Sequence, residues 1–172
     1  MSKAVMLSIR PKWCEKIVNG DKTIEVRKTR PKMNTPFKCY IYCTLQGCNE
    51  FFRVDLGGDV AKWNRGKWAD RKGKVIGEFT CDRIDRLAPA NEPYGIYDID
   101  DDYVLQTCLW NGALWDYGHG TPLYGWHISD LHIYDEAREL SEFTGLRNTR
   151  FGAAPYDIKR APQSWCYVEE DT

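Results

Sequence analysis

The sequence of 172 residues lacks any apolar run that approaches the roughly 20 residues a helix needs to cross a bilayer. Its opening residues, MSKAVMLSIRPKW, hold too short an apolar stretch for a signal peptide. An excess of one charge sign is missing too, because 24 basic and 25 acidic residues give a net charge of −1. We therefore expect a single cytoplasmic domain over residues 1–172, with no membrane partner and no coat of nucleic acid over its whole surface.

Several common catalytic patterns are also missing. The chain has three histidines, no G-x-S-x-G nucleophile elbow and no phosphate-binding P-loop. His127 and His132 are five residues apart, a spacing that places them on opposite faces of a strand. Seven cysteines at irregular spacing, without a C-x-x-C pair, indicate free thiols in a reducing compartment. No set of four convergent ligands is visible, so we expect neither a metal nor a cofactor.

Basic and acidic residues are segregated along the chain. Residues 1–38 contain ten Lys and Arg against three acids, and residues 62–74 contain six against one. Residues 82–142 reverse the sign, with thirteen acids against three arginines. If the basic segments meet in space, they form a surface that attracts anions. Two alternatives stay open: solvated faces without a partner, and an acidic segment that recruits a protein.

Hydrophobic periodicity predicts an α+β protein with five or six short strands around one or two helices. Residues 46–73 are expected to form a long loop or hairpin, residues 111–125 an ordered loop, and residues 139–143 a strand or turn. The pattern favours a small curved sheet or barrel. Strands are expected at residues 4–9, 23–28, 37–44, 74–81, 126–134 and 164–169, and helices at residues 11–19 and 99–109.

The most informative stretch runs from Ser8 to Lys28. Lys22 falls at a predicted turn between helix and strand, and Thr23, Glu25 and Arg27 then alternate on one face of the strand. If that face lines a cleft, the three groups can bind a polar ligand, whereas in a core each would need a partner. A solvent-exposed face with a neighbouring Glu25–Arg27 pair is the other interpretation.

The segments S-I-R-P-K (8–12) and G-D-K-T-I-E-V-R (20–27) resemble the ASCH domain, a branch of the PUA-like superfamily. The likeness extends to K-V-I-G-E-F (74–79), Y-G-W-H-I (124–128) and A-P-Q-S-W-C-Y (161–167), with looser insertions at about 46–73 and 88–122. This resemblance implies a PUA-like small mixed β-barrel of five to six strands, flanked by short helices. It also implies a cleft between the first helix and the barrel that binds RNA, a nucleotide or a modified nucleobase, in a bacterial or phage-borne protein.

The resemblance also implies site residues. Cationic donors from Lys22 and Arg27 would meet phosphate or carbonyl oxygens, and Glu25 would either accept from an exocyclic amine or neutralise Lys22. Tyr42 or Trp165 would stack on a base, with a place in the barrel core as the alternative for Trp165. The expected ligand-binding residues are Arg10, Lys12, Lys22, Arg27, Lys28, Tyr42, Ser164 and Trp165.

Some ASCH proteins hydrolyse the amide of N4-acylated cytidines, and others are ribonucleases. If this chain is such an enzyme, the resemblance implies Lys22, Thr23 and Glu25 as its catalytic residues. Glu25 stands where the family has its catalytic threonine, and Thr23 lies two residues earlier, so the chain departs from that pattern. Three hypotheses follow: binding of RNA or a nucleotide, hydrolysis of modified nucleosides or RNA, and protein interaction.

Overall fold

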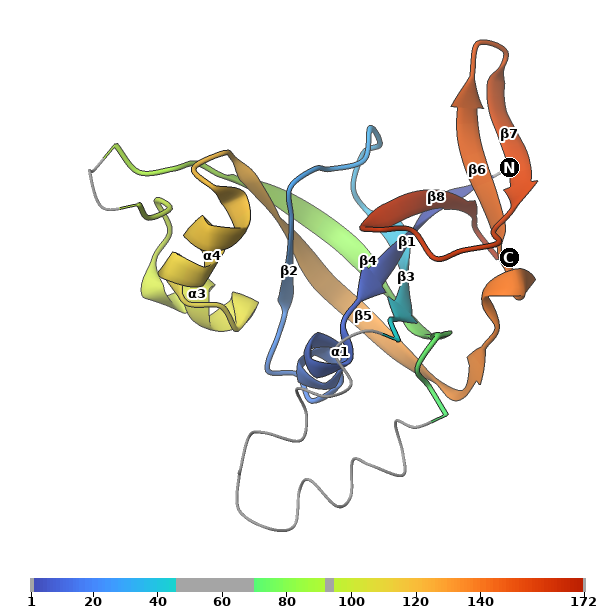
Figure 1. Ribbon diagram of the computed structural model, residues 1–172, viewed down its shortest axis with the longest axis horizontal. Coiled ribbons are helices and arrows are strands. Elements are labelled where there is room, and N and C mark those ends of the chain that lie inside the picture. Colours follow the sequence, from blue (N-terminus) through green and yellow to red (C-terminus); the bar gives the residue numbers. More distant parts are fainter. Residues whose placement is uncertain (1, 46–69, 92–94, 172) are drawn as a thin grey trace. The chain divides into compact units, whose positions relative to one another are not determined.

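The structure, a computed structural model, describes residues 2–45, 70–91 and 95–171 (Figure 1). Within these ranges the chain forms one mixed sheet of eight strands, in the order β2-β5-β4-β3-β1-β8-β6-β7, with short helices. The α+β class is therefore confirmed, with more strands than the five or six predicted. The strands are β1 (Lys3–Ile9), β2 (Ile24–Arg27), β3 (Phe37–Cys43), β4 (Lys74–Leu87), β5 (Leu123–Arg138), β6 (Thr144–Thr149), β7 (Gly152–Asp157) and β8 (Trp165–Glu169). The helices are α1 (Pro11–Val18), α3 (Asp101–Thr107), α4 (Asn111–Gly118) and the 3-10 helix η2 (Leu140–Glu142).

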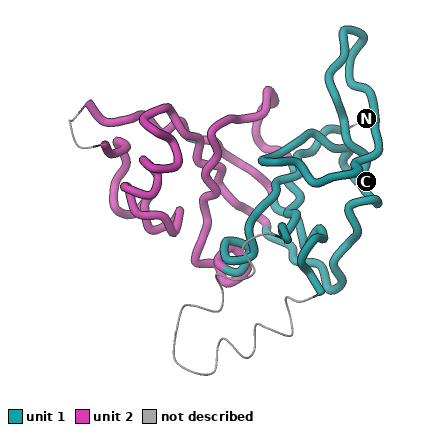
Figure 2. The backbone as a smooth tube through the Cα atoms, in the orientation of Figure 1, with its two compact units in different colours: residues 1–15, 38–79, 131–172 teal, residues 16–37, 80–130 magenta. Residues whose placement is uncertain are grey.

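The chain divides into two compact units (Figure 2). Unit 1 takes the described parts of residues 1–15, 38–79 and 131–172, and unit 2 takes those of residues 16–37 and 80–130. A single domain over residues 1–172 stays a prediction. Most of the loop or hairpin expected at 46–73 lies outside the described residues.

Unit 1 is built around β1, which pairs in parallel with β3 and antiparallel with β8. Because β1 has a neighbour on both sides, its apolar run is almost fully buried. Gly77 of β4 marks a close approach of two backbones, since a Cβ atom there would lie 2.4 Å from the carbonyl oxygen of His132. The buried cluster of this unit contains Ala4, Met6, Tyr40, Tyr42, Val75, Phe143, Ile158 and Val168.

Unit 2 contains the helix that was predicted over residues 99–109. Asp100 caps α3, because its side chain accepts a hydrogen bond from the backbone N–H of Tyr103 at 2.8 Å. The helix ends at Cys108, which adopts the left-handed conformation. The buried cluster of this unit contains Val26, Leu87, Tyr97, Leu114 and Leu123.

The expectation of a loop over residues 111–125 is wrong. Helix α4 and the start of β5 occupy this stretch, in spite of its glycines and aromatic residues. The side chain of Asn111 at the start of α4 accepts from the N–H of Tyr97 at 2.7 Å and donates to the Tyr97 carbonyl at 3.0 Å. Such a contact across the chain has no periodic signature, so the sequence pattern missed the helix.

Two strands and one short helix near the C-terminus were not predicted. The segments of β6 and β7 are rich in small and polar residues and weak in β-branched ones, so neither has a strand pattern. They become strands because six residue pairs join them, from Thr144↔Asp157 to Thr149↔Gly152. Residues 139–143, expected to form a strand or turn, contain η2 instead.

Candidate functional site

The turn after α1 and the short strand β2 position the candidate residues of unit 2. Gly20 has a φ of +81°, as expected for a residue that ends a helix in the left-handed region. β2 then pairs antiparallel with β5, with Ile24 opposite His127 and Glu25 opposite Trp126. Ile24 and Val26 are buried on one face, as predicted, and Glu25 projects to the other.

Three charged groups converge there, and we call Lys22, Glu25 and Arg27 the ion cluster. Arg27 Nη1 lies 2.7 Å from Glu25 Oε1, and Lys22 Nζ lies 3.4 Å from Glu25 Oε2. Lys22 Nζ also donates to the carbonyl oxygen of Thr107 at 2.6 Å. This carbonyl belongs to the last residue of α3, where helix carbonyls lack intrahelical partners and favour a cation.

The ion cluster corrects the interpretation of this strand face as solvent-exposed. Lys22 is 2% exposed and Glu25 is 4% exposed. Charges at such depth are tolerated because each has an opposite charge or a hydrogen-bond partner. Lys22 and Glu25 therefore neutralise each other within the protein, and Arg27, with 12% of its side chain exposed, is the most exposed member of the cluster.

Thr23 does not join the ion cluster. Its hydroxyl donates to Gln106 Oε1 of α3 at 3.3 Å, and its backbone N–H bonds to the Gln106 carbonyl. An ammonium, a carboxylate and a guanidinium thus come together, while the hydroxyl is held by the helix.

The unit 1 candidates near the N-terminus lie at the start of α1. Arg10 is exposed, and its carbonyl accepts the N–H groups of Trp13 and Cys14, which begin the helix. The ammonium of Lys12 lies 4.9 Å from the centre of the Trp13 ring. The Lys12 ammonium is therefore held at a ring of the same helix, and the backbone of Arg10 belongs to the helix start.

The other unit 1 candidates differ in exposure. Tyr42 is 8% exposed and belongs to the buried cluster, so its ring has no open face for a base. Burial raises the pKa of its hydroxyl. Ser164 accepts the N–H of Ser8 through its carbonyl at 2.9 Å. Trp165 is partly exposed and makes an edge-on contact with Tyr167 at 5.3 Å between ring centres.

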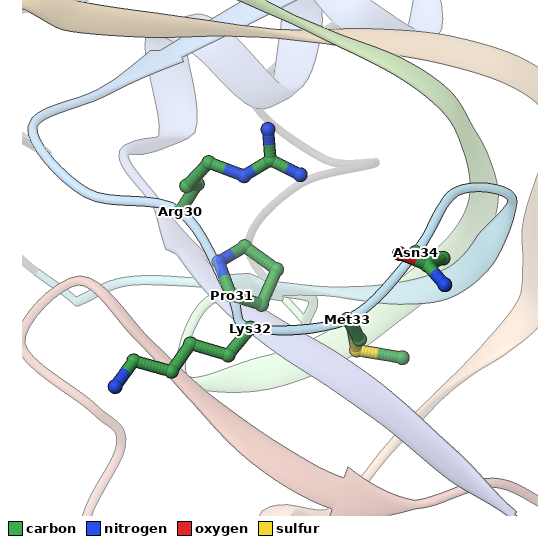
Figure 3. Close-up of a pocket in the computed structure, with 5 residues that line it drawn as sticks. All are labelled: Arg30, Pro31, Lys32, Met33 and Asn34. Carbon is green, nitrogen blue, oxygen red and sulfur yellow. The ribbon is translucent and has the colours of Figure 1, made fainter.

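A basic segment, residues 28–34, follows the ion cluster directly in the sequence. Lys28, Arg30 and Lys32 are exposed there, and the Lys28 ammonium lies 4.9 Å from the centre of the Tyr117 ring. Figure 3 shows a hollow at this loop, with the side chains of Arg30 and Lys32 extending in different directions from it. The hollow has a volume of about 480 Å³ and is lined by Arg30, Pro31, Lys32, Met33 and Asn34.

A second polar group in unit 2 was missed by the sequence analysis. His127 Nε2 of β5 lies 2.6 Å from Asp85 Oδ2 of β4, and Arg83 Nε lies 3.2 Å from Asp85 Oδ1. Burial by itself raises the pKa of Asp85. The hydrogen bond and charge of His127, together with the charge of Arg83, lower it by a larger amount, so the pKa of Asp85 lies below its usual value. The alternating D-R-I-D-R at 82–86 is the only local signal of this group.

Trp126 also lies beside the ion cluster without having been singled out. It is fully buried opposite Glu25 and makes an edge-on contact with Phe37 at 5.9 Å. Over the described ranges, no group of three or more His, Cys, Asp or Glu side chains could hold a metal ion. No described helix has both the length and the apolar character that crossing a membrane would require.

The chain was compared with known families, proteins and structures. No family model matches it, and no curated protein matches its sequence. It is similar to the crystal structure of ASCH from Zymomonas mobilis, with 17% identity, a TM-score of 0.54, and coverage of 97% of this chain and 88% of that one. Crystal structures of two point mutants of that protein are similar as well. The first mutant has a TM-score of 0.54 and 17% identity, with coverage of 98% of this chain and 92% of its own. The second mutant has a TM-score of 0.51 and 16% identity, with coverage of 97% of this chain and 89% of its own. The fold of this chain is therefore an ASCH-type fold.

Proposed function

We propose that this chain binds RNA or a related nucleotide through the basic segment. The observation that carries the proposal is the exposure of Arg30 and Lys32 at an open hollow, with the exposed Lys28 close by in the sequence. No acidic residue occurs between Glu25 and Glu50, so no carboxylate from the same stretch of chain competes for these cations. Exposed Lys and Arg side chains are the usual partners of phosphate oxygens, which dominate the affinity for nucleic acids.

The ion cluster, which precedes the basic segment in the sequence, supports this role. Two cations and one carboxylate leave it with a net charge of +1. Glu25 holds the Arg27 guanidinium at 2.7 Å and thereby fixes its direction. A guanidinium held in place loses less rotational freedom on binding than a mobile one, which favours recognition of phosphate or a carbonyl oxygen.

The test measures binding of a fluorescent single-stranded RNA dodecamer by anisotropy over a range of salt concentrations. Each phosphate contact with single-stranded nucleic acid contributes about 0.7 to the salt slope, or about fivefold in affinity at about 0.1 M salt. The double variant Arg30→Ala/Lys32→Ala should therefore bind about 25-fold more weakly and lower the slope by about 1.4.

A matched control removes another exposed pair of the same residue types, in Lys159→Ala/Arg160→Ala. This variant should bind within about twofold of the unchanged protein, because only contacts at the binding surface contribute to the slope. Equal losses in the two double variants would mean general attraction by net charge. That outcome, or no loss in Arg30→Ala/Lys32→Ala, would reject the basic segment as the binding surface.

Hydrolysis of modified nucleosides or RNA is the alternative function. A threonine nucleophile needs a base beside its hydroxyl, whereas Thr23 bonds to Gln106 and Lys22 bonds to Thr107 and Glu25. These contacts favour binding over hydrolysis. To distinguish binding from hydrolysis, N4-acetylcytidine and the RNA dodecamer are incubated with the protein and analysed by chromatography. Turnover that is lost in Lys22→Met would support the hydrolytic function.

A further inference from the structure

The β6–β7 hairpin of unit 1 ends in an exposed aromatic residue. Only Gly145 and Leu146 of β6 pair with β8, so beyond Leu146 the two strands pair with each other alone. Figure 2 shows this end of the hairpin projecting from the rest of unit 1. Phe151 at its tip is 86% exposed, the highest value among the large hydrophobic side chains described.

The turn holds Phe151 in a defined position despite this exposure. The hydroxyl of Thr149 accepts the N–H of Phe151 at 3.2 Å and donates to the carbonyl of Gly152 at 2.7 Å. Gly152 has a φ of +111°, a conformation that residues with a side chain rarely adopt. A turn whose backbone is ordered before binding loses less conformational entropy on binding, so the tip is prepared for a contact.

The charged residues nearest the tip in the sequence are all positive. Arg147 and Arg150 are exposed, and the Arg150 guanidinium lies 4.6 Å from the centre of the Phe151 ring. Lys3 of β1, which is separated from β6 by β8, reaches the hairpin, where its ammonium bonds to Asn148 at 3.2 Å. No acidic residue occurs from position 143 to 156. The tip thus presents one aromatic ring among cations.

We infer that the hairpin tip binds single-stranded nucleic acid, with Phe151 stacking on an unpaired base and Arg147 and Arg150 contacting the adjacent phosphates. This inference rests on the proposed function and adds a second contact surface in unit 1. Aromatic side chains next to cations are the usual way to bind single strands without reading their sequence. The complementary charge identifies the partner as a polyanion with exposed planar rings.

A lipid surface fits these observations less well. Binding at a membrane interface grows with the apolar area that is buried, and Phe151 is the one large apolar side chain between Arg147 and Gly152. Stacking on a base, in contrast, needs only one ring. An apolar pocket on a protein partner would accept leucine in place of phenylalanine, and this difference enters the test.

The experiment measures anisotropy with the RNA dodecamer as a single strand and as a duplex. Phe151→Ala should weaken binding of the single strand about tenfold, because a stacked base contributes on that order. Phe151→Trp should retain the affinity, and Phe151→Leu should lose it as the alanine variant does. Binding of the duplex should change less than twofold with Phe151→Ala, because its bases are already stacked on each other. Arg150→Ala should weaken the single strand about fivefold at about 0.1 M salt.

Trp110→Ala is the matched control, since Trp110 is also an exposed aromatic residue, at 68%. It should leave binding unchanged. Unchanged binding by Phe151→Ala, full binding by Phe151→Leu, or an equal loss with the duplex would overturn the inference. So would Phe151-dependent flotation with phosphatidylserine vesicles in the absence of an effect on RNA.

The outcomes separate this inference from the proposed function. If Arg30→Ala/Lys32→Ala weakens binding and Phe151→Ala does not, the hairpin inference alone fails. If only Phe151→Ala weakens binding, the hairpin inference stands and the basic segment is rejected. If the unchanged protein binds neither RNA, both fail.

Discussion

Replacing Glu25 with glutamine removes one charge from the ion cluster and almost preserves the shape of the side chain. Glu25 is 4% exposed and lies between Arg27 Nη1 at 2.7 Å and Lys22 Nζ at 3.4 Å. In Glu25→Gln, the 2% exposed ammonium of Lys22 keeps its hydrogen bond to Thr107 and loses its counter-charge. The variant therefore leaves a buried cation without an anion, which is unfavourable.

The magnitude follows from the distances and the burial. At an effective dielectric constant of about 20, two unit charges 3.4 Å apart attract by about 5 kcal/mol, and desolvation offsets part of this. Removing one partner of a buried pair costs about 3–5 kcal/mol. A chain of 172 residues has an unfolding entropy of about 0.36 kcal/mol per kelvin, so the melting temperature should fall by about 8–14 °C.

The assay is thermal unfolding followed by circular dichroism, for Glu25→Gln, Lys22→Met and the double variant. The double variant should lose less stability than the two single variants together, by about 1 kcal/mol or more, because no unpaired lysine charge is left. Asp116→Asn, at an exposed position of unit 2, is the control and should change stability by less than about 0.5 kcal/mol. A Glu25→Gln protein that melts within about 2 °C of the unchanged one, with strictly additive effects, would refute a stabilising role of the ion cluster.

Three further predictions concern other parts of the fold. Asp85 has a pKa below its usual 3.8 when folded, so the stability it contributes is present above that value and is lost as the pH falls through the folded pKa. The difference in melting temperature between the unchanged protein and Asp85→Asn should therefore hold above about pH 5 and shrink below about pH 4, and a constant difference down to about pH 2 would contradict the His127 contact. Gly77→Ala should cost about 1–3 kcal/mol in denaturant titrations, since its Cβ would meet the carbonyl oxygen of His132 at 2.4 Å, and unchanged stability would show that the strands can separate. Ile24→Asp should prevent folding, because Ile24 is fully buried, and a cooperative melt of that variant would contradict the face assigned to it.

Features set by neighbouring residues could be predicted from the sequence. Strand β1, helix α1, the left-handed Gly20 and the buried face of β2 all follow from periodicity and turn chemistry within a few residues. Asp100 likewise indicates the start of α3, because the side chain of an N-cap residue bonds to a backbone N–H in the first turn of the helix that follows it.

Features that depend on distant partners could not be predicted. The hydrogen bond from Lys22 to Thr107 joins residues 85 positions apart, and the contact of Asp85 with His127 joins residues 42 apart. Periodicity can place Lys22 and Glu25 near one another, yet it cannot say whether a helix end covers them. The burial of the ion cluster is therefore visible only in the structure. The structure likewise shows that this strand face carries ion-paired side chains and is not exposed to solvent.

The buried charges also limit how β2 can mispair. β2 is an edge strand of four residues, so it could slip by one position along β5 and keep much of its backbone hydrogen bonding. Such a slip would turn Glu25 toward the apolar cluster of unit 2, where Val26 normally packs. A buried carboxylate without a counter-charge is strongly unfavourable, more so than the hydrogen bonds kept by the slipped strand are favourable. The ion cluster therefore selects the correct register of the edge strand β2.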